Sequence, residues 1–255
     1  MKMKIKEYIH PTFRIHRELT KLFFAIKTRT YKHRIKYIYE KSGSKQLVIS
    51  FTAFSEKPCY NYYRTLKPCK CDKLFLQDNF GYRGSYLLYE NGTDLPYRLT
   101  SELLGNIIKK GNYLKIIMLG SSKGGADSII FGLELGASEI FSGANQYYLG
   151  KYLNTEDDNR KLIFKAMMGE NAGKKEQEVL DSVMPNILKK HKDSRSHIHI
   201  LYSKEEHTYE DHIKFMIEDL KKTNIPFTEV VEHFDDHNEV GRYFSPYILK
   251  HIKQE

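Results

Sequence analysis

Residues 113–126 read Tyr113-Leu-Lys-Ile-Ile-Met-Leu-Gly-Ser-Ser-Lys-Gly-Gly-Ala126, an apolar run that ends in a tight turn and passes at once into a helix-like segment. The turn, Gly120-Ser-Ser-Lys-Gly124, has the G-x-S-x-G pattern, which presents a serine nucleophile when it joins a strand to a helix. Because the chain reverses sharply there, the residues two before and two after the serine come into contact, and only glycine fits. This register selects Ser122, since the positions two away from Ser121 hold a leucine and a lysine.

The same glycines fit the phosphate-binding patterns less well. The segment lacks the Gly-x4-Gly-Lys-Ser/Thr spacing of a phosphate loop, Lys123 is not followed by a hydroxyl residue, and no G-x-G-x-x-G occurs there. Taken alone, the motif also fits a glycine- and serine-rich turn without chemistry. The flanking elements and the residues that follow in the chain favour the nucleophile.

Length and composition indicate one soluble globular domain. The chain has 255 residues, of which 40% are hydrophobic and 29% charged, and no Pro/Gly/Ser-rich linker divides it. We therefore expect a single domain over residues 1–255. The longest apolar runs are too short to cross a membrane, and no apolar segment follows the basic N-terminus as in a secretory signal. We expect a cytoplasmic protein.

The charge balance is basic, with 41 Lys and Arg against 32 Asp and Glu and a net charge of +9. Such an excess favours polyanionic partners or a phosphate-bearing ligand, although it also fits a solvated surface. The basic residues are densest in the first 45, so this N-terminal face could dock at the inner face of a membrane or on a partner. Nucleic acid is disfavoured as a partner because no recognition motif accompanies the charge.

Cysteine usage argues against a structural metal. The chain has only Cys59, Cys69 and Cys71, and no second pair stands at the spacing that a zinc site of about four ligands needs. We expect no metal and no disulfide framework.

Strands and helices alternate from about residue 100 onward, which indicates a mostly parallel central sheet with helices on both faces. The elbow serine then lies at the carboxyl edge of the sheet, where sites in such folds lie. The polar, helix-like residues 154–191 lie between two strands and are expected to form an inserted helical cap. Expected strands are 34–40, 47–51, 73–76, the run before Gly120, 139–141, 197–202 and 227–232; expected helices are 101–110 (capped by Thr100 or Ser101), 123 to about 136, 209–222 and 240–252.

A base and an acid follow the serine in the order of an α/β-hydrolase. His237 lies in the loop beyond the final strand, ahead of a helix, and we prefer it as the base over His233, which is nearer the strand end. For the acid we prefer Glu206 over Glu205, since it lies one step further into the loop after strand 197–202. Asp235 and Asp236 are local rivals that suit a helix cap better.

An oxyanion hole needs two backbone N–H groups. One comes from the residue after the nucleophile, Lys123, and the other from the loop after an early strand. The loop Phe51-Thr-Ala-Phe54 is the natural source, and Ala53 is our candidate.

At these residues the chain resembles the bacterial capsular polysaccharide biosynthesis proteins of the α/β-hydrolase type. The resemblance rests on Gly-Ser-Ser-Lys-Gly-Gly, on the Leu-Val-Ile-Ser-Phe strand, and on Asn61-Tyr62 before Leu74-Phe-Leu-Gln-Asp78, and it runs from about residue 45 to the C-terminus. That group is similar to capsule O-acetyltransferases that use a Ser–acid–His triad and acetyl-CoA. Carried over, the triad falls on Ser122, Glu206 and His237, with a glutamate where an aspartate is more usual.

The resemblance implies transfer of an acetyl group from acetyl-CoA to a hydroxyl of a capsular or surface polysaccharide, through an acetyl-enzyme on Ser122. Acetyl-CoA is then a substrate, and no cofactor is permanently bound. The partners implied are an anionic polysaccharide and membrane-associated capsule machinery. Lys123, Arg83 and Arg64 are candidate contacts to anionic ligands, and a solvated surface cation is the alternative for each, since surface charges usually contribute little. Two alternatives stay open: a serine esterase or deacetylase acting on acylated polysaccharide, and a non-catalytic capsule assembly factor.

Overall fold

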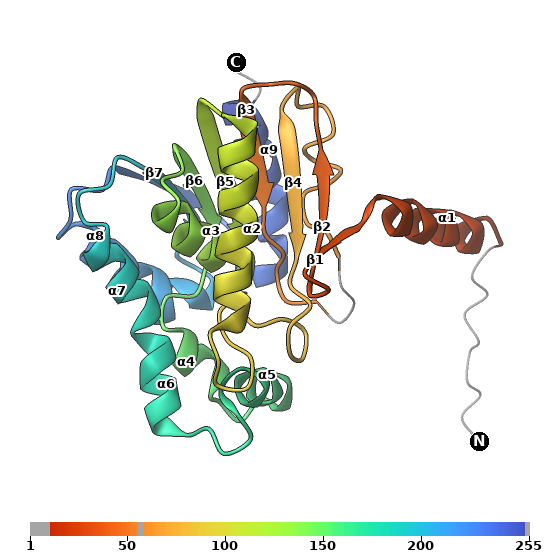
Figure 1. The fold of residues 1–255 in the computed structure, drawn as a ribbon. Coiled ribbons are helices and arrows are strands. Elements are labelled where there is room, and N and C mark those ends of the chain that lie inside the picture. The colour runs from red at the N-terminus through yellow and green to blue at the C-terminus, as the bar shows by residue number, and fades with distance from the viewer. Residues whose placement is uncertain (1–10, 56–58, 253–255) are drawn as a thin grey trace, which may run out of the picture.

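One sheet of eight strands organises the molecule, and a computed structural model describes it over residues 11–55 and 59–252, with side chains from residue 18 onward. The strand order is β1-β2-β4-β3-β5-β6-β7-β8 (Figure 1). All neighbouring pairs from β4 to β8 are parallel, and β1 and β2 add an antiparallel edge. The strands are β1 (Arg29–Tyr31), β2 (Ile35–Glu40), β3 (Gln46–Ser50), β4 (Asp72–Gln77), β5 (Lys115–Ser121), β6 (Glu139–Gly143), β7 (His197–Ser203) and β8 (Phe227–Glu232).

The central strands are apolar on both faces because both faces are covered. Leu47 and Ile49 of β3 point into one core, and Val48 between them points into the other. Successive side chains of a strand alternate between faces, so a continuous apolar run is what a doubly covered strand requires.

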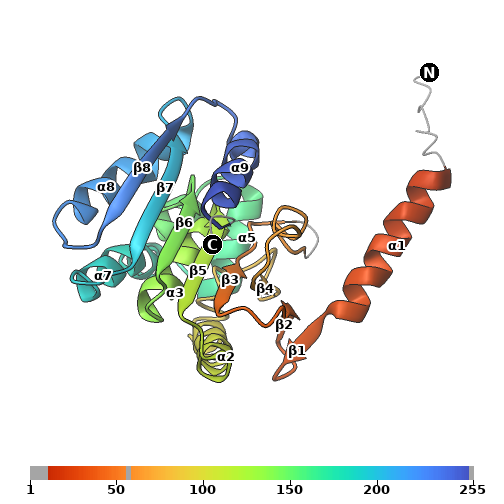
Figure 2. The same cartoon turned by 90° about the horizontal axis from the view of Figure 1, so that it is seen from above.

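Helices cover the two faces. The helices α2 (Leu95–Gly111), α3 (Lys123–Glu134), α7 (Val183–Lys190) and α8 (Lys214–Leu220) contribute to one core, and α9 (Val240–Ile252) contributes to the other. Figure 2 shows α2 and α9 on opposite sides of the sheet. This is the expected mostly parallel sheet with helices on both faces.

The helix α2 begins earlier than the sequence predicts. Its first residue is Leu95, after the N-cap residue Asp94, and Thr100 is a buried residue inside it. The prediction that Thr100 or Ser101 caps this helix is therefore wrong, because Pro96 in the first turn already fixes a helical φ. Gly111 is the last residue of the helix, one position beyond the predicted end, and Asn112 follows in the left-handed conformation.

The segment between β6 and β7 is helical. It holds α4 (Leu149–Leu153), α5 (Asp158–Met168), α6 (Lys174–Asp181) and α7. The last of these packs against α3 and α8, so it also serves as the crossover between two parallel strands. A capping role for residues 154–191 stays a prediction, as do the single-domain bounds. A π-helical turn, η1 (Tyr209–Ile213), precedes α8, and a short 3-10 helix, η2 (His237–Glu239), precedes α9.

The helix α1 (Pro11–Lys27) extends away from the body of the molecule (Figures 1 and 2). The sequence shows no clear period over residues 12–30, and this helix was not expected. Lys2, Lys4 and Lys6 of the basic N-terminal segment lie outside the described residues, as do the side chains of Arg14 and Arg17. Within the described part of the chain, no helix is both long and apolar enough to cross a membrane.

Candidate active site

Ser122 lies at the turn between β5 and α3, with φ 52° and ψ −126°. A positive φ is strained for a residue with a side chain and is typical of positions that function requires. A Cβ on Gly120 would lie 2.2 Å from the carbonyl oxygen of Gly124, and one on Gly124 would lie 2.7 Å from that of Phe51. Both glycines are thus required sterically. Gly120 is required because the two sides of the elbow approach each other, as the sequence predicts, whereas Gly124 is required because the backbone after β3 packs against it.

The structure brings Glu206 and His237 together. Glu206 follows β7, His237 opens η2 after β8, and His237 Nδ1 lies 3.0 Å from Glu206 Oε1 in a hydrogen bond. The side chain of Glu206 is fully buried and that of His237 is 24% exposed. A carboxylate on Nδ1 fixes the imidazole so that Nε2 is the nitrogen free to accept a proton.

The environment keeps Glu206 ionised. Burial raises its pKa, but the hydrogen bonds from His237 and from the Thr208 hydroxyl outweigh this and leave the pKa below its ordinary value. His207 Nδ1 also lies 2.7 Å from Glu206 Oε1, and its ring centroid is 5.7 Å from that of His237. Sequence reasoning did not single out His207 or Thr208, although both follow the chosen acid directly.

The rival residues form a separate pair on the surface. His233 Nδ1 lies 3.0 Å from Glu205 Oε1, and these side chains are 85% and 54% exposed. Asp236 accepts a hydrogen bond from the Asn238 amide and caps η2, as the sequence predicts for these aspartates. Only the Glu206 pair has the desolvation that strengthens a charge–imidazole interaction.

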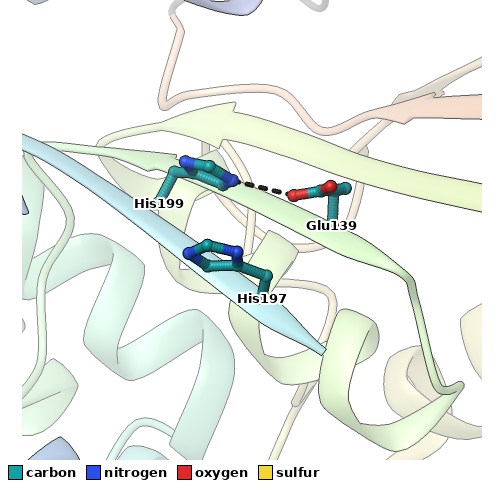
Figure 3. A group of neighbouring side chains, drawn as sticks. All are labelled: Glu139, His197 and His199. Carbon is teal, nitrogen blue, oxygen red and sulfur yellow. Dashed lines mark hydrogen bonds and ion pairs between the residues drawn. The ribbon is translucent and has the colours of Figure 1, made fainter. Parts of the chain in front are cut away.

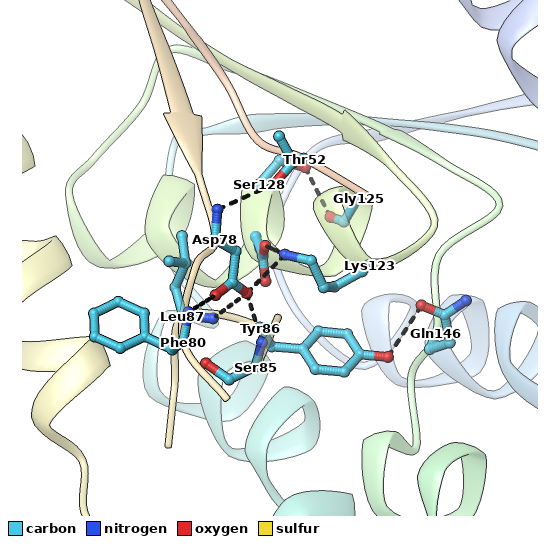
Figure 4. Close-up of polar contacts among 11 residues, drawn as sticks. Thr52, Asp78, Phe80, Ser85, Tyr86, Leu87, Lys123, Gly125, Ser128 and Gln146 are labelled. Carbon is cyan, nitrogen blue, oxygen red and sulfur yellow. Dashed lines mark hydrogen bonds and ion pairs between the residues drawn. The ribbon is translucent and has the colours of Figure 1, made fainter. Parts of the chain in front are cut away.

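The hydroxyl of Ser122 contacts a glutamine rather than the histidine. Gln146 Nε2 donates to Ser122 Oγ at 3.1 Å. Tyr86 Oη donates in turn to Gln146 Oε1 at 3.2 Å (Figure 4). His237 Nε2 is buried and has no hydrogen-bond partner among the residues that the structure describes. Catalytic hydrogen bonds are often long in unliganded enzymes and tighten with substrate bound. Gln146 was missed because the loop after β6 carries no motif, although its polar run directly after a buried strand was a signal.

The side chain of Lys123 points into the protein. Its Nζ lies 3.0 Å from Asp78 Oδ2 and 2.8 Å from Asp127 Oδ2, and it is completely buried (Figure 4). Burial raises the pKa of Asp127 to about 7, even though Lys123 opposes this. The expectation that the Lys123 side chain contacts an anionic ligand or lies in solvent is wrong, because the first turn of α3 packs directly on Asp78.

Asp78 ties this ion pair to a loop at the site. Its carboxylate accepts hydrogen bonds from the amides of Ser85, Leu87 and Phe80 at 2.7, 3.1 and 3.3 Å (Figure 4). Tyr86 and Leu87 both have positive φ, so this loop is strained and is held by Asp78. The network thereby fixes the elbow helix and the tyrosine that contacts Gln146 as one unit.

Ala53 follows β3 and borders a cavity of about 150 Å³ that also touches Asp78, Arg83, Cys59 and Gln77. Cys59 and Gln77 also line a larger cleft of about 780 Å³. The oxyanion roles of the Ala53 and Lys123 amides stay predictions.

The larger cleft combines aromatic and basic side chains. Tyr60, Tyr62 and Tyr63 line it together with Lys36 and Arg64. Neither cation has an ion-pair partner among the described residues. Tyr62 Oη donates to Ser121 Oγ at 2.6 Å, so the cleft reaches the residue next to the elbow serine.

A cluster that resembles a metal site lies at the other end of the sheet. Glu139 begins β6 and His197 and His199 belong to the start of β7 (Figure 3). The two imidazole rings are stacked with centroids 4.4 Å apart and planes 18° apart, so one ion cannot lie in both ring planes. Both nitrogens of His199 already have partners, Tyr247 Oη and Glu139 Oε2, each at 2.8 Å. The cluster is therefore arranged as a hydrogen-bonded stack.

Comparison with solved structures identifies the fold, while no protein-family model and no curated protein matches the chain. The capsule O-acetyltransferase of Neisseria meningitidis serogroup A, in complex with CoA, is similar with a TM-score of 0.73 and 21% identity over 88% of this chain and 94% of that one. The Staphylococcus aureus serine hydrolase FphF has a TM-score of 0.60 and 16% identity over 86% and 91%. An S-formylglutathione hydrolase from Agrobacterium tumefaciens has a TM-score of 0.60 and 12% sequence identity, over 89% of this chain and 93% of that one. These similarities confirm the α/β-hydrolase-like fold and, at the level of fold, the resemblance to capsule O-acetyltransferases.

Proposed function

We propose that this protein is a serine-dependent O-acetyltransferase that moves an acetyl group from acetyl-CoA to a hydroxyl of a capsular or surface polysaccharide. The observation that carries the proposal is the buried Glu206–His237 hydrogen bond, formed by the loops after β7 and β8, in a chain that presents Ser122 on a strained elbow. The fold similarity to a capsule O-acetyltransferase solved with CoA supports the choice of donor.

In the first step His237 Nε2 takes the proton of Ser122 as the hydroxyl oxygen attacks the thioester carbonyl. The tetrahedral oxyanion is stabilised by the amides of Ala53 and Lys123. The C–S bond then breaks, CoA leaves as the thiol with the proton from His237, and Ser122 carries the acetyl group. In the second step a sugar hydroxyl gives its proton to His237 and attacks the acetyl carbonyl of the acetyl-enzyme. The bond from that carbonyl to Ser122 Oγ then breaks, His237 returns the proton to Ser122 Oγ, and the acetylated sugar is released.

The residues around the serine suit an enclosed reaction. Gln146 Nε2 donates a hydrogen bond to Ser122 Oγ and must yield the hydroxyl to His237 for the reaction to begin. The helical segment 154–191 is proposed to limit the access of water, which a transferase needs because water competes with the sugar hydroxyl.

The aromatic and basic cleft supports CoA as the donor. Coenzyme A has a planar adenine, several phosphate charges and a long thiol-bearing arm. We propose that the three tyrosines and Arg64 with Lys36 hold the nucleotide, since guanidinium groups bind phosphate and aromatic rings stack on bases. The cavity beside Ala53 would then admit the arm toward Ser122.

The test of this function separates transfer from hydrolysis. The purified protein is incubated with acetyl-CoA and de-O-acetylated capsular polysaccharide, and the acetyl content of the polymer and free acetate are both measured. Acetyl gain by the polymer, abolished in Ser122→Ala, is the expected result. Release of acetate from an acetylated polymer without transfer would instead identify an esterase, and acetylation by Ser122→Ala at the wild-type rate would reject a catalytic serine.

A further inference from the structure

The helix α1 carries a stripe of exposed apolar side chains. Leu19, Leu22, Phe23 and Ile26 are 58%, 57%, 42% and 75% exposed. Their spacing of i, i+3, i+4 and i+7 places all four on one side of the helix. Scattered exposed apolar residues are ordinary, but a contiguous stripe on one helix marks an interaction surface.

The stripe faces away from the body of the protein. Phe24, on nearly the opposite side of the helix, packs on Tyr60 and Tyr63 with ring centroids 5.7 and 5.1 Å away. Lys27, in the last turn, forms an ion pair with Glu40. Phe23, the aromatic residue of the stripe, touches the body at its margin, where its ring meets that of Tyr63 edge-on. The helix is thus anchored at its C-terminal end and extends outward (Figure 2), and its apolar stripe is exposed.

The charge of this region indicates what covers the stripe. Residues 1–27 contain seven Lys and Arg against two Glu, so their net charge of +5 is more than half of the chain's +9. Lys21 lies on the side of α1 opposite the stripe, where its exposed ion pair with Glu18 contributes little. Two copies of such a helix would repel each other, whereas an anionic surface attracts it.

We propose that α1 lies in the interface of an anionic lipid bilayer, with the stripe of Leu19, Leu22, Phe23 and Ile26 inserted at the boundary between headgroups and acyl chains. An amphipathic helix with a basic polar side and a Leu/Phe apolar side binds membranes in this way, through apolar burial together with attraction to anionic lipid. The proposal goes beyond the proposed acetyl transfer and does not depend on it, because lipid binding requires no catalytic residue.

The test is co-sedimentation of the full chain with vesicles of phosphatidylcholine, alone or mixed with phosphatidylglycerol. Wild type should sediment with the mixed vesicles, and less so as salt is raised, because salt screens the attraction. In Leu22→Ser/Ile26→Ser the partition coefficient should fall about tenfold for each side chain lost from the bilayer. The matched control is Leu114→Ser, since Leu114 is 84% exposed and directly precedes the central strand β5, outside α1. It should bind as wild type does.

Thermal melting of each variant shows whether the fold is kept, and none of the three substituted side chains belongs to the buried cores. Failure of wild type to bind the mixed vesicles would overturn the proposal, and so would equal binding by the double variant. An oligomer in solution that dissociates only in Leu22→Ser/Ile26→Ser, without lipid binding, would identify the stripe as an interface between copies and would also overturn it.

Discussion

Glu205 and Glu206 are neighbours in the chain, but their surroundings differ sharply. The Glu206 side chain is fully buried against His237, and Glu205 is exposed beside His233. From the sequence, each glutamate could serve either histidine, and only loop position separates them. Burial distinguishes the Glu206–His237 pair from the Glu205–His233 pair. This burial depends on how the loops after β7 and β8 pack against each other, and the sequence of either loop alone does not predict that packing.

Replacing Glu206 by Gln should lower kcat for acetyl transfer by roughly two to four decades, because an amide neither holds the imidazole tautomer nor stabilises the imidazolium. Steady-state rates with acetyl-CoA measure the effect. Glu205→Gln is the matched control and should retain the wild-type kcat. Equal losses in both variants, or a loss only in Glu205→Gln, would show that the acid is assigned wrongly.

Lys123 shows where residue-level prediction fails. The elbow motif predicts the position of the Lys123 amide, but it does not predict where the ammonium group at the end of the long side chain lies. The carboxylates that receive its ammonium come from Asp127, one turn along α3, and from Asp78, at the end of a different strand. A contact between residues 45 positions apart follows from tertiary packing, which is why the sequence did not reveal it.

At the scale of the element, the β5–elbow–α3 unit was predictable because its glycines have a steric role. Gly120→Ala would place a Cβ 2.2 Å from backbone atoms of the opposite limb, so the backbone must move. We expect the free energy of unfolding in urea to fall by about 3 kcal/mol or more.

The matched control for the elbow is Gly105→Ala within α2, where an added Cβ meets no atom within 4 Å. It should raise stability by about 0.5–1 kcal/mol, since alanine favours a helix over glycine. Similar stability of the Gly120→Ala variant and the wild type would contradict the steric role of the glycine.

Other elements were less accessible from the sequence. The helix α1 gave no clear period, because Phe24 turns inward while the apolar stripe turns outward, so hydrophobic residues occupy two sides. The first residue of α2 was misplaced by six positions, because a proline turn and not a serine cap starts it. The parallel strands β3, β4, β6 and β7 were recovered because they are short, largely buried apolar runs. The strand β8 is only partly buried, and its alternation with the helices α8 and α9 located it.

The loop 59–66 that follows β3 offers a prediction about the donor. Arg64→Gln should lower kcat/KM for acetyl-CoA about ten- to a hundredfold, the usual worth of a hydrogen bond to a charged group. Hydrolysis of p-nitrophenyl acetate, which has no nucleotide, should stay unchanged. Loss of both activities would mean that Arg64 supports the fold or the catalytic residues, and loss of neither would place the nucleotide elsewhere.

At the scale of the whole molecule, stability should depend on pH through buried histidines. Burial lowers the pKa of His212 from 6.5 to about 4. Its Nδ1 accepts a hydrogen bond from the Tyr148 amide, which requires an unprotonated nitrogen. Between the unfolded pKa of 6.5 and the folded pKa of about 4, the unfolded chain binds a proton that the folded protein does not. The free energy of unfolding is therefore highest at neutral pH and falls by on the order of 3 kcal/mol as the pH drops through this range.

Urea unfolding at about pH 7 and about pH 4.5 measures this dependence. In His212→Gln, which keeps an acceptor for the Tyr148 amide, the free energy of unfolding should fall less between the two pH values than in the wild type. The exposed His233 provides the comparison, and His233→Gln should leave the slope unchanged. An unchanged slope in His212→Gln would show that other groups cause the acid sensitivity.

The most direct measurement of the central claim is intact-mass spectrometry of the protein mixed with acetyl-CoA and quenched in acid, followed by peptide mapping. The acetyl-enzyme mechanism predicts a mass gain of one acetyl group located on Ser122, absent from Ser122→Ala and strongly reduced in His237→Ala. Acetyl transfer to polysaccharide without any adduct on the wild type, or an adduct that persists in Ser122→Ala, would contradict it.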